Sequence, residues 1–312
     1  MKLGYACINM QLSYPTKYGD KPKGTESITT GRSMIKRTFE SKGVDYASEI
    51  TLANAKDLHN IMTWNVLNGY NFYRMTSGLA PWKTEYEWND LKDIKEIKQW
   101  LHSAGTMANT HGVRVTSHPG PFNVLVSPNE NVVENTFQDL TMHGDVFDFM
   151  GLSRTHYNKI NIHCNGVYGD KISAMDRFCK NFQQLPESVK TRLTVENDDK
   201  ASMYSVKELY DGIYKRINIP IVFDYHHHRF CDGGLSEQEA LELAMSTWGD
   251  ITPVVHYSES RSEEQLDESI KPQAHSDLIK ELPNTYGNKV DIMVEAKHKE
   301  LSIKQFIKGS QK

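Results

Sequence analysis

The stretch IPIVFDYHHH, at residues 219–228, indicates the fold class because a buried apolar run ends abruptly on an acidic side chain. Ile219–Phe223 is short and rich in β-branched residues, which is typical of a strand buried on both faces of a parallel sheet. Asp224 ends the run, and His227 follows three residues later. The carboxyl edge of such a sheet is where ligand-binding side chains collect.

Seven further runs share this character and alternate with segments of helical periodicity. The predicted strands are Leu3–Ile8, Asn71–Met75, Val113–Thr116, Ile160–Ile162, Leu193–Val195, Ile219–Phe223, Pro253–Val255 and Val290–Val294. Helices are expected over Asp90–Ala108, Val132–Phe149, Ile172–Leu185, Val206–Arg216 and Ser236–Trp248, and a long loop over Pro15–Gly31. Eight strands alternating with helices predict one (β/α)8 TIM barrel spanning residues 1–312. An open doubly wound sheet is the alternative, but no glycine-rich phosphate loop follows any strand.

Six successive runs end on His, Asp or Glu. These end residues are His118, His163, Glu196, Asp224, His256 and Glu295. In a parallel barrel the C-terminal strand ends converge on one mouth, where imidazoles and carboxylates form the usual ligand set for divalent cations. A single strand-end His is more often a hydrogen-bonded structural residue, but six such groups together would bury like charges without a cation to offset them. Two further histidines are candidate ligands. His227 follows Asp224 by three residues, and His275, in AHSD, could reach the same mouth.

Composition limits the remaining possibilities. The net charge of -4 neither supports nor excludes a nucleic-acid partner, because bound cations would offset the carboxylates. No apolar run approaches the roughly 20 residues of a membrane span, and the first residues fit a strand better than a signal peptide. The four cysteines form no CxxC pair, as in reduced intracellular proteins. An intracellular monomer without an obligate protein partner is expected.

The sequence resembles the UV-damage endonuclease family over most of its length. The matching blocks, in the family's order, are LGYACINMQL (3–12), FYRMTS (72–77), SHPG (117–120), DFMGL (148–152), NIHCNG (161–166), VENDD (195–199), FDYHHHRF (223–230), VVHYS (254–258), AHSD (274–277) and DIMVEAK (291–297). Several short blocks in one order are far more specific than any block alone. The related apurinic endonucleases share the barrel.

The resemblance implies a DNA-repair endonuclease that acts on damaged double-stranded DNA. It implies hydrolysis by metal-activated water immediately 5′ of UV photoproducts, and of abasic or other lesions, leaving a 3′-hydroxyl and a 5′-phosphate. It also implies two or three divalent ions, commonly manganese, with zinc and magnesium as open alternatives. The implied ligands are His118, His163, Glu196, Asp224, His227, His256, His275 and Glu295. Of these, Glu196, Asp224, His256 and Glu295 are the expected catalytic residues, with Glu196 as the bridge between ions.

The resemblance also assigns residues that contact DNA, and the sequence departs from the family at three places. Tyr5 and Asn9 match positions near the lesion or the scissile phosphate, and Arg74 matches a phosphate or structural contact. Glu85 stands where the family has a His and is a candidate ligand. Val254 replaces a lysine that is carboxylated in some members. Pro121 and Phe122 replace a Gln-Tyr pair that probes damaged bases, so the aromatic wedge is kept and its hydrogen-bonding partner is lost.

Two other functions remain open from the residues alone. The first is a metal-dependent sugar isomerase or epimerase on the same barrel, and the second is a damage-binding protein whose cluster has decayed. Replacement of the family's His by Glu85 and of its lysine by Val254 is the only support for the second.

Overall fold

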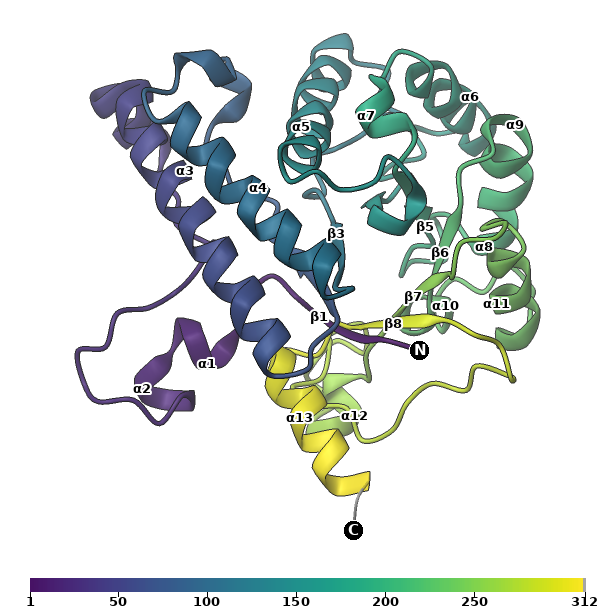
Figure 1. Cartoon of the computed structure of the whole chain (residues 1–312). Coiled ribbons are helices and arrows are strands. Elements are labelled where there is room, and N and C mark those ends of the chain that lie inside the picture. Colours follow the sequence, from purple (N-terminus) through teal and green to yellow (C-terminus); the bar gives the residue numbers. More distant parts are fainter. Residues whose placement is uncertain (311–312) are drawn as a thin grey trace.

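The computed structural model describes residues 1–310, and its centre is a closed barrel of eight parallel strands in sequence order (Figure 1). The strands are β1 (Leu3–Ala6), β2 (Phe72–Met75), β3 (Arg114–Ser117), β4 (Ile160–Ile162), β5 (Leu193–Glu196), β6 (Ile221–Asp224), β7 (Val254–Tyr257) and β8 (Asp291–Val294). Pairing of Leu3 with Ile292 closes the barrel. The predicted TIM barrel is confirmed, and the last two residues of the predicted domain lie outside the described part.

Helices surround the barrel. The longer ones are α3 (Lys36–Leu67), α4 (Ile94–Thr110), α5 (Glu130–Phe149), α6 (Lys171–Phe182), α11 (Glu237–Met245) and α13 (Lys299–Ser310). Shorter helices are α1 (Met10–Ser13), α2 (Pro15–Tyr18), α7 (Glu187–Lys190), α8 (Val206–Leu209), α9 (Lys215–Ile217), α10 (Tyr225–His228) and α12 (Arg261–Gln265). Single turns are η1 (Lys83–Glu85), η2 (Trp88–Asp90), η3 (His156–Asn158) and the π-helical η4 (Tyr210–Tyr214).

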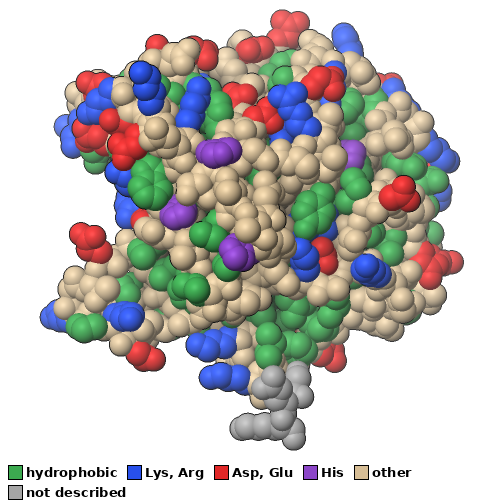
Figure 2. All heavy atoms as spheres, in the orientation of Figure 1, with side chains coloured by type: hydrophobic (Ala, Val, Ile, Leu, Met, Phe, Trp, Pro, Cys, Tyr) green, Lys and Arg blue, Asp and Glu red, His purple; other side chains and the backbone are tan. Residues whose placement is uncertain are grey.

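The predicted helices occur, with small changes at their ends. Helix α11 begins at the capping box that Ser236 and Glu239 form. The stretch predicted as one helix over Val206–Arg216 is divided into α8, η4 and α9. The predicted loop over Pro15–Gly31 begins with the short helix α2 and is irregular from Gly19 onward. Figure 2 shows a notch in the outline between the part of the chain that carries α1 and α2 and the N-terminal end of α3.

Helix α3 was not predicted from the sequence. It lies beside α4 along one side of the molecule (Figure 1). Its buried face carries polar side chains, including Ser48, Thr51 and Asn54, so hydrophobic periodicity is weak there. Gly43 also interrupts the helix with a φ of 67°. Asn54 shows why polar residues are tolerated, because its amide donates to the buried carbonyl of Leu79 at 3.0 Å.

The floor of the barrel combines close apolar packing with one buried ion pair. A Cβ at Gly4 would lie 2.6 Å from the Phe72 ring, so glycine at this position lets the ring fill the interior. Arg114 is fully buried, and its Nη1 donates to Asp291 Oδ2 at 3.0 Å and to the Thr252 carbonyl at 2.8 Å. This pair joins β3, the loop before β7, and β8 across the barrel.

The described residues include no helix that is both long enough and apolar enough to span a membrane. The four cysteines are all free thiols. On the face drawn in Figure 2, acidic and basic side chains are interspersed, so that face shows no large area of one charge.

We expect Asp291→Ala to lower the free energy of unfolding by about 3–5 kcal/mol, because it leaves the buried Arg114 charge without its partner. Asp211→Ala is the control, since it removes a carboxylate from exposed pairs with Lys207 and Lys215. That change should cost less than about 1 kcal/mol. Urea unfolding measures both values, and equal losses would contradict a structural role for the buried pair.

Candidate metal centre

Seven side chains meet at the C-terminal end of the barrel. We call His118, His163, Glu196, Asp224, His227, His256 and Glu295 the strand-end cluster. Glu196, Asp224 and His256 are in their strands, while His118, His163 and Glu295 each follow a strand by one residue. Because the strands are parallel and in register around a closed barrel, residues far apart in sequence reach one small volume.

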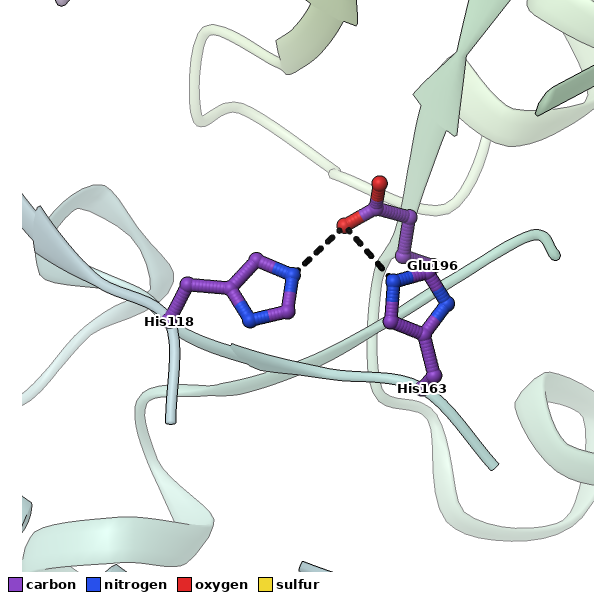
Figure 3. A group of neighbouring side chains, drawn as sticks. All are labelled: His118, His163 and Glu196. Atoms are coloured by element: carbon purple, nitrogen blue, oxygen red, sulfur yellow. Dashed lines mark hydrogen bonds and ion pairs between the residues drawn. The ribbon is translucent and has the colours of Figure 1, made fainter. Parts of the chain in front are cut away.

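The strand-end cluster contains three overlapping groups that could each hold one cation. They are His118–His163–Glu196, Glu196–Asp224–His227 and Asp224–His256–Glu295, and within each group one ligand atom per residue lies within 4.8 Å of the others. Glu196 and Asp224 each belong to two groups, so their carboxylates can bridge neighbouring ions. Figure 3 shows the first group, in which both imidazoles point toward the same oxygen of Glu196. The Nε2 atoms of His118 and His163 lie 3.2 and 3.7 Å from that oxygen.

Polar contacts at Nδ1 orient the imidazoles of three cluster histidines, through hydrogen bonds at His118 and His227 and an ion-pair contact at His163. His118 Nδ1 lies 3.1 Å from the Pro119 carbonyl, and His227 Nδ1 lies 2.9 Å from the Asn197 carbonyl. A carbonyl only accepts, so both Nδ1 atoms carry the proton and both Nε2 atoms keep a free lone pair. His163 Nδ1 lies 3.3 Å from Asp198 Oδ1, which favours the same arrangement. Partners of this kind are what orient metal-binding histidines in proteins.

His256 is turned the other way. Its Nδ1 lies 3.1 Å from Glu196 Oε1 and 3.2 Å from Glu295 Oε1, so Nδ1 is the atom that faces the cluster. Its Nε2 lies 3.1 Å from Nζ of the buried Lys159. Burial lowers the pKa of Lys159 to about 7. The neutral amine is therefore accessible, and it can accept a hydrogen bond from the Nε2–H group of His256. Val254, at the family's lysine position, packs instead in the apolar floor of the barrel.

The three carboxylates of the cluster are buried, and the charges around them shift their pKa values in different directions. Burial raises the pKa of Glu196, but the charges of His256 and His163 outweigh burial and hold that pKa well below its usual range. Burial likewise raises the pKa of Glu295, and the ion pair with Arg74 and the charge of His256 outweigh it. Burial raises the pKa of Asp224, and this effect prevails over the opposing charge of His227. A cation would therefore stabilise ionised Asp224 in particular.

Unpartnered atoms in the cluster fit a divalent ion. Asp224 Oδ2 and His256 Nδ1 are both buried and make no hydrogen bond. Leaving buried polar atoms unpaired costs roughly 1–3 kcal/mol each, and a shared cation would satisfy both. This mixture of imidazole nitrogen and carboxylate oxygen donors suits manganese, zinc or iron. Calcium would prefer a site made of oxygen donors alone.

The structure places the other two predicted ligands differently. His275 lies beside the cluster, with Nδ1 2.6 Å from Ser258 Oγ and Nε2 3.9 Å from Glu295 Oε2. Glu85 is exposed on η1 and belongs to none of the three groups. Of the HHH run, only His227 joins the groups, while His226 and His228 are buried outside them.

The predicted DNA contacts divide into buried and exposed residues. Tyr5 is fully buried, and its hydroxyl donates to Asn65 Oδ1 at 2.6 Å and accepts from Asn9 Nδ2 at 3.0 Å. Asn9 is also fully buried and caps α1, so these two side chains support the loop after β1 in the structure. Pro121 is exposed, and 87% of the Phe122 side-chain surface is open to solvent. Arg74 pairs with Glu295, which is the structural alternative predicted for it.

Sequence reasoning missed the residues that support the ligands. Asp198 follows Glu196 by two residues in the VENDD block and contacts His163. Asn161, two residues before His163, donates to Glu196 and accepts from Thr194 Oγ1 at 2.7 Å. Period-2 alternation could have found Asn161 and Lys159, because both share the barrel-facing parity of His163.

The chain is similar to UV-damage endonucleases over nearly all of its own length. The family model described as UV-endonuclease UvdE matches residues 1–311. The chain is 32% identical to the UV DNA damage endonuclease of Bacillus mycoides, over 95% of this chain and 92% of that protein. It is also 32% identical to the UV-damage endonuclease of Schizosaccharomyces pombe, over 97% of this chain but only 49% of that protein. The chain therefore spans about half the length of the yeast relative.

Solved structures extend the match to the fold. The crystal structure of SacUVDE superposes with a TM-score of 0.80 at 28% identity, covering 100% of this chain and 98% of that one. A D-psicose 3-epimerase from Clostridium cellulolyticum superposes with a TM-score of 0.52 at 12% identity, over 95% of this chain and 85% of that one. The second likeness shows the shared barrel fold only.

Glu196→Ala is expected to abolish stoichiometric metal binding, because Glu196 belongs to two of the three groups. Glu85→Ala is the matched control, since the exposed Glu85 carboxylate lies outside the groups, and it should leave the metal content unchanged. Elemental analysis of the purified proteins after manganese loading measures the content. Loss of metal in Glu85→Ala would show that η1 moves to supply a ligand.

Metal binding should weaken as the pH falls. Burial lowers the pKa of His163, but the charges of Glu196 and Asp198 outweigh it and raise that pKa to about 9. A cation must therefore displace this proton at neutral pH, and the apparent affinity should drop by up to about tenfold per pH unit. Calorimetric titration with manganese in buffers of different ionisation heat measures the released proton. A constant affinity between about pH 6 and pH 8 would contradict the assignment of His163 as a ligand.

Proposed function

The chain belongs to the UV-endonuclease UvdE family, and we propose that it is a DNA-repair endonuclease that cuts damaged duplex DNA immediately 5′ of UV photoproducts. The observation that carries this proposal is the strand-end cluster, whose ligand atoms lie within 4.8 Å of one another in each of three groups. The proposed products are a 3′-hydroxyl and a 5′-phosphate. Abasic sites and other lesions that unstack easily are proposed as further substrates.

The proposed cofactors are two or three divalent ions, with manganese preferred. When bound, such ions activate water and offset negative charge on a phosphodiester undergoing hydrolysis. The three carboxylates of the cluster carry one negative charge each, so two divalent ions already leave a net positive charge for the phosphate. The protein's own part is to hold the ligands in place before DNA arrives.

Three charged side chains outside the metal groups contact cluster ligands: Arg74, Lys159 and Asp198. Arg74 pairs with Glu295, and Lys159 contacts the Nε2 atom of His256. Asp198 lies on the Nδ1 side of His163 and leaves Nε2 directed at Glu196. Glu295, His256 and His163 are thus each held by a partner that does not itself belong to a metal group.

Phe122 is proposed to fill the gap left by an extruded lesion. Two hydrogen bonds anchor its loop to α5: Asn123 Nδ2 donates to Asp139 Oδ2 at 2.7 Å, and the Val124 amide donates to Thr136 Oγ1 at 3.0 Å. An exposed apolar ring on an anchored loop is suited to insertion between bases, and damaged bases leave the stack at low cost. DNA as substrate would place the protein where DNA is held, and a monomer suffices because one chain supplies all the ligands in the three groups.

A 5′-labelled duplex with one photoproduct tests the proposal directly. Manganese-loaded protein should cut it once, immediately 5′ of the lesion, and a chelator should abolish the cut because the cluster loses its ions. The undamaged duplex is the substrate control, and Glu196→Ala is the protein control. Absence of a chelator-sensitive cut on photoproducts, abasic sites and mismatches alike would overturn the proposed function.

A further inference from the structure

We propose that Tyr168 is a second aromatic DNA contact, which stacks on a nucleobase of the damaged strand next to the position probed by Phe122. This inference rests on the proposed function. Tyr168 would determine how tightly lesion DNA is held, separately from the metal ligands.

Exposed aromatic side chains are concentrated at one end of the barrel. Among the described residues, three aromatic side chains are exposed: Tyr14, Phe122 and Tyr168. They lie in the connections that follow β1, β3 and β4, all at the C-terminal end that carries the strand-end cluster. Exposed aromatic rings cost free energy in water, so their concentration around one mouth indicates a surface that contacts a partner.

Tyr168 lies in a short loop with a closely defined backbone. The loop runs from the ligand His163 to Asp170, the N-cap of α6. Tyr168 has a φ of 47° and Asn165 a φ of 60°, a left-handed conformation that is unfavourable for a tyrosine. Half of the Tyr168 side-chain surface is nevertheless exposed, so packing in the core does not account for the ring.

Two contacts join this loop to the loop that carries Phe122. Asn165 Nδ2 donates to the Asn123 carbonyl at 3.2 Å, directly after Phe122 in the chain. Arg177 Nε donates to the Val126 carbonyl at 2.6 Å, while its guanidinium lies 5.7 Å from the centre of the Tyr168 ring. The two exposed rings are therefore carried by one connected unit, on neighbouring strands of the barrel.

Gly166 sets the position of the Tyr168 ring. A Cβ at Gly166 would lie 2.7 Å from Cε2 of Tyr168, so the ring packs against the bare backbone there. The ring is thus held between this backbone and Arg177, and part of it is left open to solvent. An aromatic surface that is held in place and backed by a guanidinium suits base stacking, which tolerates any base. The Pro121 side chain has no donor or acceptor, so stacking by Phe122 and Tyr168 does not depend on a side-chain hydrogen bond from that position.

Single-turnover incision of a duplex with one photoproduct tests the proposal, using manganese-loaded full-length protein. Varying the protein concentration gives the half-saturating concentration and the maximal rate separately. Tyr168→Ala should raise the half-saturating concentration about tenfold and leave the maximal rate within about twofold of wild type. Tyr168→Phe keeps the ring and should behave like wild type. Phe122→Ala serves as a comparison for loss of the first ring.

Gly166→Ala provides a second test, because it displaces the ring without removing it. It should raise the half-saturating concentration in the wild-type background and have a smaller effect when combined with Tyr168→Ala, where only the backbone strain at a φ of 158° remains. Metal content and thermal unfolding of each variant, compared with wild type, show that the site is intact. An unchanged half-saturating concentration in Tyr168→Ala, or an equal loss in Tyr168→Phe, overturns the proposal. If wild-type protein fails to cut any lesion duplex, the proposed function has failed instead.

Discussion

The structure depends on one buried carboxylate, that of Glu196, and on the imidazoles that surround it. An anion with only 1% of its surface exposed is costly to bury unless positive charge or strong hydrogen bonds compensate. His118, His163 and His256 provide that compensation from three other strands. The parallel barrel is what brings these strand ends together, so fold and site are linked by the same constraint.

The second layer around the cluster explains why the ligands keep their orientation. His118 and His163 direct Nε2 toward Glu196, and a carbonyl or a carboxylate lies on the Nδ1 side of each ring. His256 offers Nδ1, because Lys159 lies against its Nε2 from below. Val254, which the resemblance places at a lysine position of the family, is apolar. The buried amine that contacts His256 belongs to Lys159, which immediately precedes β4.

Much of the fold and cluster could be predicted from the sequence, for identifiable reasons. Strand-end residues such as Asp224 and Glu295 could be found because buried parallel strands are continuous apolar runs with one polar residue at the end. Helix α3 could not, because Asn54 and its neighbours place polar side chains on the buried face. The burial of Tyr5 and Asn9 and the exposed position of Glu85 depend on loop conformations, which strand periodicity does not encode.

Membership of Glu196 and Asp224 in two ligand groups each leads us to propose that both carboxylates bridge divalent ions at the barrel mouth. Anomalous diffraction from manganese-grown crystals, collected at the manganese absorption edge, tests this most directly. We expect at least two anomalous peaks, each within coordination distance of a Glu196 or Asp224 oxygen, about 2.2 Å. A well-ordered structure with no anomalous peak beside Glu196 would contradict it.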